Sequence, residues 1–162
     1  MKDLDRKLHP SSIAPSATHV HYKDLTDYHI FLDESALAAG HTVTLDKLTD
    51  EMKVYIYADS ISSAAKATAN PDAMTKYVAK SALSSIQMSK HNVVRLENRA
   101  ENDRQSILQT LRRNPEKKFF VITQSRNFAT EILALGNPNH LAARTCNNRG
   151  EFAIYRGEES DA

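Results

Sequence analysis

Acidic side chains follow three apolar segments of this 162-residue chain, close to the point where each segment ends. Asp33 directly follows YHIFL, Asp59 follows KVYIY after one alanine, and Glu97 directly follows NVVRL. A fourth acid, Asp103, stands where a helix is expected to begin. Crowded carboxylates repel one another unless a cation or protons intervene, and Mg²⁺ and Mn²⁺ prefer carboxylate oxygen. Because such an ion activates water and neutralises phosphate, phosphodiester hydrolysis is the first reaction to consider.

Each acid also has a purely structural interpretation. An acid in the first turn of a helix is often only a cap, which contributes about 0.5–2 kcal/mol. A cap explains Asp103 and Asp33 without any chemistry, and Asp59 would then point to solvent. Both interpretations stay open until the positions of the elements are known.

From residue 28 onward, short runs rich in β-branched and aromatic residues alternate with longer stretches of helical spacing. The predicted strands are residues 28–32, 53–57, 92–96 and 119–123, followed by a C-terminal hairpin of strands 141–146 and 151–155. The predicted helices are residues 35–39 with a continuation at 45–52, then 73–88, 100–113 and 127–135. This alternation predicts an α/β domain with a mostly parallel sheet covered on both faces. Ligands of such sheets bind beyond the carboxyl ends of the strands, where the acids stand.

The ends of the chain and its composition bound the remaining possibilities. Residues 1–25 contain Pro10 and Pro15 without an apolar period, which predicts an extended N-terminal arm outside the core, ahead of one domain at 26–162. No apolar run approaches the roughly 18 residues of a membrane span, and no secretion signal is evident, so we expect a cytoplasmic protein that does not contact membranes. The single cysteine, Cys146, excludes an internal disulfide.

Three segments resemble the PIN domain family of metal-dependent nucleases. IFLDESAL at residues 30–37 is similar to the family's opening, in which an apolar strand ends in an Asp followed by a small residue and Ser or Thr. VITQSRNFA at residues 121–129 is similar to the strand, turn and helix start that the family writes V-T-x-D-R-N-L. NDRQSIL at residues 102–108 is similar to the helix start with a central acid. In this order, the segments cover most of residues 28–135.

The resemblance implies a Rossmann-like three-layer fold in which acidic residues bind Mg²⁺ or Mn²⁺ and cut RNA, as in many toxins of bacterial toxin–antitoxin pairs. Asp33 matches the family's first acid and Asp103 its third, which makes these two the candidate catalytic residues. A metal set would then be Asp33 and Asp103 with Asp59 and Glu97 as replacements from neighbouring strand ends.

Two acidic positions of the family are neutral in this chain. The helix after the second strand has Ser62, Ser63 and Ala64 in place of a Glu, and the turn after the fourth strand has Gln124 and Ser125 in place of an Asp. Neutral oxygens supply no charge to hold a hard ion or to lower the pKa of its water. The sequence therefore predicts a divergent member in which tight metal binding is weakened or lost.

Basic residues concentrate between positions 95 and 118, where seven stand against four acids, although the whole chain has a net charge of only +1. These charges either contact phosphates or form a solvated helix face. The candidate nucleic-acid contacts are Ser35, Arg104, Ser125, Arg126 and Asn127.

Three functions follow from these patterns. The first is a divergent PIN-like protein with weak or no nuclease activity that binds RNA or a protein partner, either antitoxin-like or regulatory. The second is an active Mg²⁺- or Mn²⁺-dependent ribonuclease of the toxin–antitoxin type. The third is a regulatory or assembly module that does not contact nucleic acid. The resemblance also suggests a homodimer, without indicating which face would form it.

Overall fold

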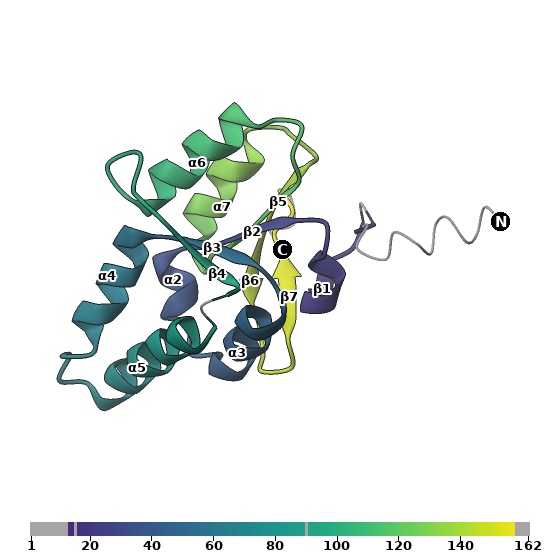
Figure 1. Cartoon of the computed structure of the whole chain (residues 1–162). Coiled ribbons are helices and arrows are strands. Elements are labelled where there is room, and N and C mark those ends of the chain that lie inside the picture. Colours follow the sequence, from purple (N-terminus) through teal and green to yellow (C-terminus); the bar gives the residue numbers. More distant parts are fainter. Residues whose placement is uncertain (1–12, 15, 90, 158–162) are drawn as a thin grey trace.

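One sheet of seven strands organises the computed structural model, which describes residues 13–14, 16–89 and 91–157 (Figure 1). The strands are β1 (His19–His21), β2 (His29–Leu32), β3 (Val54–Tyr57), β4 (Val93–Leu96), β5 (Phe119–Ile122), β6 (His140–Thr145) and β7 (Glu151–Ile154). Their order in the sheet is β1-β7-β6-β5-β2-β3-β4. Strands β4, β3, β2, β5 and β6 run parallel. At the edge beyond β6, β7 pairs antiparallel with β6 and β1 pairs antiparallel with β7. The predicted parallel sheet and C-terminal hairpin are confirmed.

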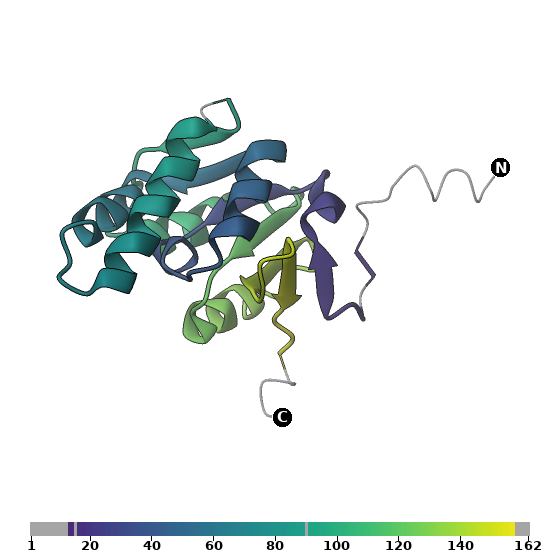
Figure 2. The ribbon, with the colours of Figure 1, turned by 90° about the horizontal axis from the view of Figure 1, so that it is seen from below.

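Helices cover both faces of this sheet. They are the 3₁₀ helix η1 (Tyr22–Leu25) and the α-helices α2 (Glu34–Leu37), α3 (Thr42–Glu51), α4 (Ala58–Ala67), α5 (Ala73–Met88), α6 (Asp103–Arg113) and α7 (Arg126–Leu133). Helices α6 and α7 lie on one face, and α3 and α5 lie on the other, where Figure 2 shows these two side by side. The structure therefore has the predicted three layers.

The alternation of side chains along the strands explains why two cores form. In β2, Ile30 and Leu32 belong to the core cluster under α3 and α5, whereas Phe31 belongs to the cluster under α6 and α7. The same alternation holds in β5, where Phe120 faces the first cluster and Val121 the second. Because both faces are buried, these strands appear in the sequence as continuous apolar runs.

The chain changes direction in the sheet between β2 and β5. After β2 it builds β3 and β4 on one side, and it then returns to place β5 on the other side of β2. Ligands of open α/β sheets bind at such a switch point, beyond the carboxyl ends of the two strands. Since Leu32 pairs with Ile122, the residues that follow, Asp33 and Thr123, lie side by side at this switch point.

Helix α4 is absent from the helices that the hydrophobic pattern predicts. Its ten residues, ADSISSAAKA, bury only Ser60 and Ala64. Small side chains give a weak apolar period, although they allow the helix to lie close to its neighbours.

The expectation that residues 1–25 lie outside the core is wrong for part of this segment. Val20 of β1, Tyr22 and Leu25 are all buried, because β1 pairs with β7 and η1 folds over the sheet. A strand of three residues is too short for its alternation to be visible in the sequence. Residues 1–12 and 15 of the predicted arm lie outside the described residues.

The turn between β6 and β7 depends on this N-terminal segment. Gly150 has φ +81°, and a Cβ atom placed there would lie 2.7 Å from Cδ1 of Tyr22. The Gly150 carbonyl also accepts a hydrogen bond of 2.8 Å from the Tyr22 amide. Only glycine tolerates both the left-handed backbone and the close approach.

In the described part of the chain, no helix is both long and apolar enough to cross a membrane.

Candidate functional site

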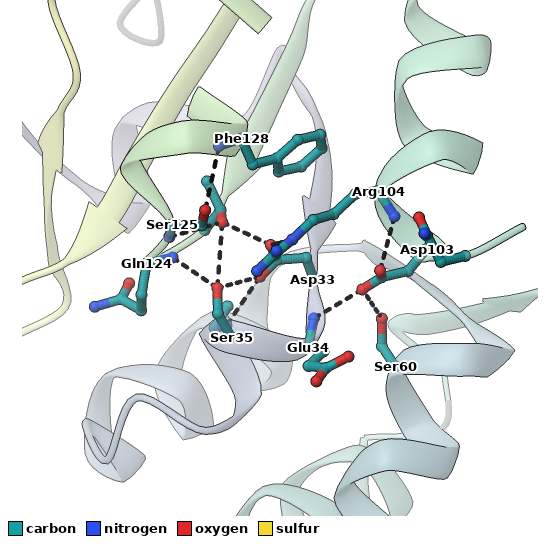
Figure 3. A network of polar contacts seen from close by, with 12 residues as sticks. Asp33, Glu34, Ser35, Ser60, Asp103, Arg104, Gln124, Ser125 and Phe128 are labelled. Carbon is teal, nitrogen blue, oxygen red and sulfur yellow. Dashed lines mark hydrogen bonds and ion pairs between the residues drawn. The ribbon is translucent and has the colours of Figure 1, made fainter. Parts of the chain in front are cut away.

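Asp33 caps the N-terminus of α2 and is fully buried at the carboxyl end of β2 (Figure 3). Its Oδ1 accepts hydrogen bonds from the Ser35 hydroxyl at 2.7 Å and the Ala36 amide at 3.0 Å. Its Oδ2 accepts from the Thr123 hydroxyl at 2.6 Å and from Nε of Arg104 at 3.1 Å. A carboxylate has about four lone-pair positions, so these four donors occupy all of them.

The turn between β5 and α7 sets the direction of the two hydroxyl groups. The Gln124 amide donates to Oγ of Ser35 at 2.8 Å, and the Ser125 amide donates to Oγ1 of Thr123 at 3.1 Å. Because each hydroxyl oxygen accepts from an amide, its single proton is directed onward to the Asp33 carboxylate. The chain of donors therefore runs from the backbone through the hydroxyls to Asp33.

Arg104, in the first turn of α6, forms the ion pair with Asp33. Its guanidinium carbon lies 5.6 Å from the centre of the Phe128 ring, and its side chain is 37% exposed. Contact with a carboxylate on one side and an aromatic ring on the other suits the planar guanidinium group. Among the described residues, no other cationic side chain forms an ion pair with Asp33.

Asp103 begins α6 and holds the start of two other helices. Its Oδ2 accepts from the Glu34 amide of α2 at 2.9 Å and from the Ser60 hydroxyl of α4 at 2.7 Å. Its Oδ1 accepts from the Arg104 amide at 2.7 Å. Asp33 and Asp103 thus lie at one edge of the sheet, and Arg104 contacts the first through its side chain and the second through its backbone. The structural role of the two acids is evident from these contacts.

Asp103 also belongs to a group of three acidic residues that does not include Asp33. Carboxylate oxygens of Glu34, Asp59 and Asp103 all lie within 4.8 Å of one another. Glu34 is exposed and accepts a hydrogen bond of 3.2 Å from the Ser63 hydroxyl, while Asp59 is half-buried. The structure thus brings together two acids of the predicted metal set, Asp59 and Asp103, and adds Glu34. In the part of the chain that the structure describes, neither Asp33 nor the exposed Glu97 belongs to such a group.

A divalent ion at Asp33 does not fit this arrangement. Mg²⁺ needs a carboxylate lone pair at about 2.0–2.1 Å, and every such position of Asp33 already faces a donor hydrogen. The neutral Gln124 provides no substitute ligand, because its side chain bonds the backbone of Thr145 at 2.9 and 3.3 Å. A cation shared by Asp33 and Asp103 would have to displace Arg104.

Exposed polar residues border this edge on the side of α7. Ser125 caps the helix through the Phe128 amide at 3.2 Å, and Arg126 and Asn127 follow it as exposed residues of the first turn. The Arg126 guanidinium lies 5.7 Å from the centre of the Tyr155 ring. Burial raises the pKa of the Tyr155 hydroxyl, which donates a hydrogen bond of 3.0 Å to the Thr123 carbonyl. The Tyr155 ring therefore supports the Arg126 side chain, which is exposed and can bind an anion from solvent.

The arrangement of strands and helices is similar to the fold of a PIN domain. One solved structure with this fold is that of the PIN domain endonuclease Utp24, with a TM-score of 0.56 and 14% sequence identity. The match covers 80% of this chain and 92% of that one. At this identity, the likeness shows the fold and not the activity. No protein-family model and no curated protein sequence matches the chain.

Three residues that shape the site are absent from the candidates that the sequence suggests. Glu34 adjoins Asp33 and Thr123 ends a predicted strand, so the position of both in the sequence points to this edge of the sheet. The position of Ser60 does not point there, because its contact with Asp103 joins residues 43 positions apart.

Proposed function

We propose that this chain is a PIN-like RNA-binding protein with weak or no nuclease activity. The observation that carries the proposal is the saturated carboxylate of Asp33, whose fourth contact is Arg104 rather than an open position. Metal-dependent cleavage requires an ion that binds a water molecule and lowers its pKa. A guanidinium group does not bind water as a ligand and so cannot activate it.

RNA contacts are proposed at the edge next to this closed carboxylate. Arg126 and Asn127 are exposed, and Arg104 uses only its Nε on Asp33, so its outer edge faces solvent. The hydroxyls of Ser35 and Ser125 bond within the protein and contribute to RNA binding by positioning the edge. Each phosphate contact releases counterions, which makes binding dependent on salt.

The test combines binding and cleavage on the same RNA. Fluorescence anisotropy with a labelled single-stranded RNA should show binding that weakens with salt, and Arg126→Gln should lower the slope of log K against log salt by about 0.7. Arg112→Gln, an exposed change in the last turn of α6, is the matched control and should leave the slope unchanged. Incubation with Mn²⁺ should yield little or no cleavage above the level of a heat-denatured sample. Robust cleavage that Asp33→Ala abolishes would refute the proposal.

A second candidate function rests on the acidic group of Glu34, Asp59 and Asp103. Three carboxylates within 4.8 Å can hold one Mg²⁺ or Mn²⁺, which would make the chain a metal-dependent ribonuclease with a displaced centre. This candidate predicts cleavage that Glu34→Gln and Asp59→Asn each abolish and that Asp33→Asn reduces less.

The third candidate, a regulatory or assembly module, predicts neither cleavage nor salt-dependent RNA binding. We further propose that the chain binds a protein partner or forms a homodimer. Sedimentation of the purified chain alone, and after addition of RNA, distinguishes a homodimer from an RNA-bound monomer.

A further inference from the structure

We infer that Arg104 is the resident cation of this site, and that it occupies the position at Asp33 where a PIN-like nuclease would bind a divalent ion. The inference deepens the proposed function, because it names the group that keeps a metal away from Asp33. It rests on the proposed lack of metal-dependent cleavage and is independent of RNA binding.

The charge balance of the buried groups supports this assignment. Asp33 is completely buried, and a buried carboxylate without a cation or hydrogen bonds is strongly unfavourable. Arg104 supplies a full positive charge at 3.1 Å from Oδ2, and the other three donors to this carboxylate are neutral. The folded chain therefore carries its own counter-ion to Asp33.

The placement of Arg104 follows from the backbone as well as from its charge. Asp103, the residue before it, accepts from the Glu34 amide at 2.9 Å and from the Ser60 hydroxyl at 2.7 Å, which fixes the first turn of α6 beside α2 and α4. The Phe128 ring then supports the guanidinium from α7. Two helices that pack on the same face of the sheet thus direct one side chain to Asp33.

A guanidinium group and a divalent ion compete for the same oxygen. Oδ2 of Asp33 already accepts from Thr123 and Arg104, so an ion could bind there only after Arg104 had moved away. The 37% exposure of the Arg104 side chain means that one edge of the pair faces solvent. Removal of Arg104 should consequently leave Oδ2 open to a soluble cation.

Thermal unfolding of the full chain, after treatment with EDTA, tests the inference without RNA. After the chelator is removed, metal-free Arg104→Gln should unfold at a lower temperature than the wild type. Mn²⁺ at about ten times its dissociation constant for the variant should then raise the unfolding midpoint of Arg104→Gln by about 3–5 °C beyond any rise in the wild type. This additional rise should vanish in the double variant Arg104→Gln with Asp33→Asn. Arg112→Gln, on the same helix, should respond to Mn²⁺ as the wild type does.

Binding at the Glu34, Asp59 and Asp103 group cannot imitate this result, because it would occur equally in the wild type and in Arg104→Gln. An equal response of the two proteins would overturn the inference, as would an additional response that survives Asp33→Asn. If Arg104→Gln does not fold, Arg104→Met decides. Methionine keeps an unbranched stem against Phe128 but removes the charge at Asp33, so its Mn²⁺ response should exceed that of the wild type, and an unchanged response would overturn the inference. Loss of RNA binding alone would refute only the proposed function.

Discussion

The Ser60 hydroxyl donates a hydrogen bond of 2.7 Å to Oδ2 of Asp103, although the two residues are 43 positions apart in the sequence. The same oxygen accepts from the Glu34 amide at 2.9 Å. Asp103 therefore joins α6 to the N-terminal turns of α2 and α4. The acid that the PIN resemblance assigns to a metal also stabilises the structure.

Replacement of Asp103 by asparagine should destabilise the fold. Asparagine offers one acceptor oxygen to the three donors that now reach the carboxylate, so a buried donor loses its partner at a cost of about 1–3 kcal/mol. Urea unfolding measures the loss, with the exposed neighbour change Glu101→Gln as control, which should stay within about 0.5 kcal/mol of the wild type. Equal midpoints for the two variants would show that these hydrogen bonds contribute nothing measurable.

Replacement of Asp59 by asparagine should have the opposite effect. It removes one of three carboxylates that lie within 4.8 Å, and relief of the repulsion should stabilise the chain by about 0.5–1 kcal/mol at low salt. The gain should shrink in high salt, because ions screen the half-exposed charges. Glu97→Gln removes an acid outside this group and should change little. Destabilisation by Asp59→Asn that appears only when Mg²⁺ is present would instead indicate a bound ion.

His140 should make the stability depend on pH. Burial lowers the pKa of this side chain and outweighs the opposing effect of the Asn114 and Lys117 backbone. Among the described residues, neither ring nitrogen forms a hydrogen bond of ordinary geometry. Burial, together with Lys117 and Lys53, lowers the pKa of His29 as well. When the folded-state pKa lies below the unfolded one, the unfolded chain binds the proton first. Stability is then complete above the unfolded pKa of about 6.5 and falls as the pH decreases through that value.

Urea midpoints at pH 7.5 and 5.5 measure this dependence. His140→Leu removes one titrating group and should reduce the loss of stability between the two pH values. The same change at the exposed His19 should leave the loss unaltered. If His140→Leu steepens the pH dependence, the sign of the argument is wrong.

Gly150 and Gly136 separate two causes of a glycine requirement. Both have positive φ, +81° and +67°, but only at Gly150 would a Cβ atom meet another residue, the ring of Tyr22 at 2.7 Å. Gly136→Ala should therefore cost about 1–2 kcal/mol for the backbone alone, and Gly150→Ala clearly more. Similar costs at both positions would argue against the packing of the N-terminal segment on the C-terminal hairpin.

Strands buried on both faces were the most predictable part of this fold. The run at Phe119–Ile122 is entirely buried and has no polar interruption, so it is visible without tertiary information. Helix α4 and strand β1 were not predictable in full, since small residues and three-residue strands leave little periodicity. Their positions depend on partners far along the chain, α5 for α4 and β7 for β1.

The site was predictable in its location but not in its contacts. Asp33 and Asp103 end or begin predicted elements, and the rule for parallel sheets places both at one edge. The pairing of Asp33 with Arg104 spans 71 positions and depends on the packing of α6 beside α7, which no local pattern encodes. For the same reason, Glu34 joined Asp59 and Asp103 in one group while Glu97 did not.

The most direct test of the closed site is a crystal soaked in Mn²⁺ and measured at a wavelength where manganese scatters anomalously. No anomalous peak should appear at Asp33, and the Arg104 guanidinium should still contact Oδ2. A peak within about 2.0–2.6 Å of either Asp33 oxygen, with Arg104 displaced, would show that a metal ion can replace the guanidinium group.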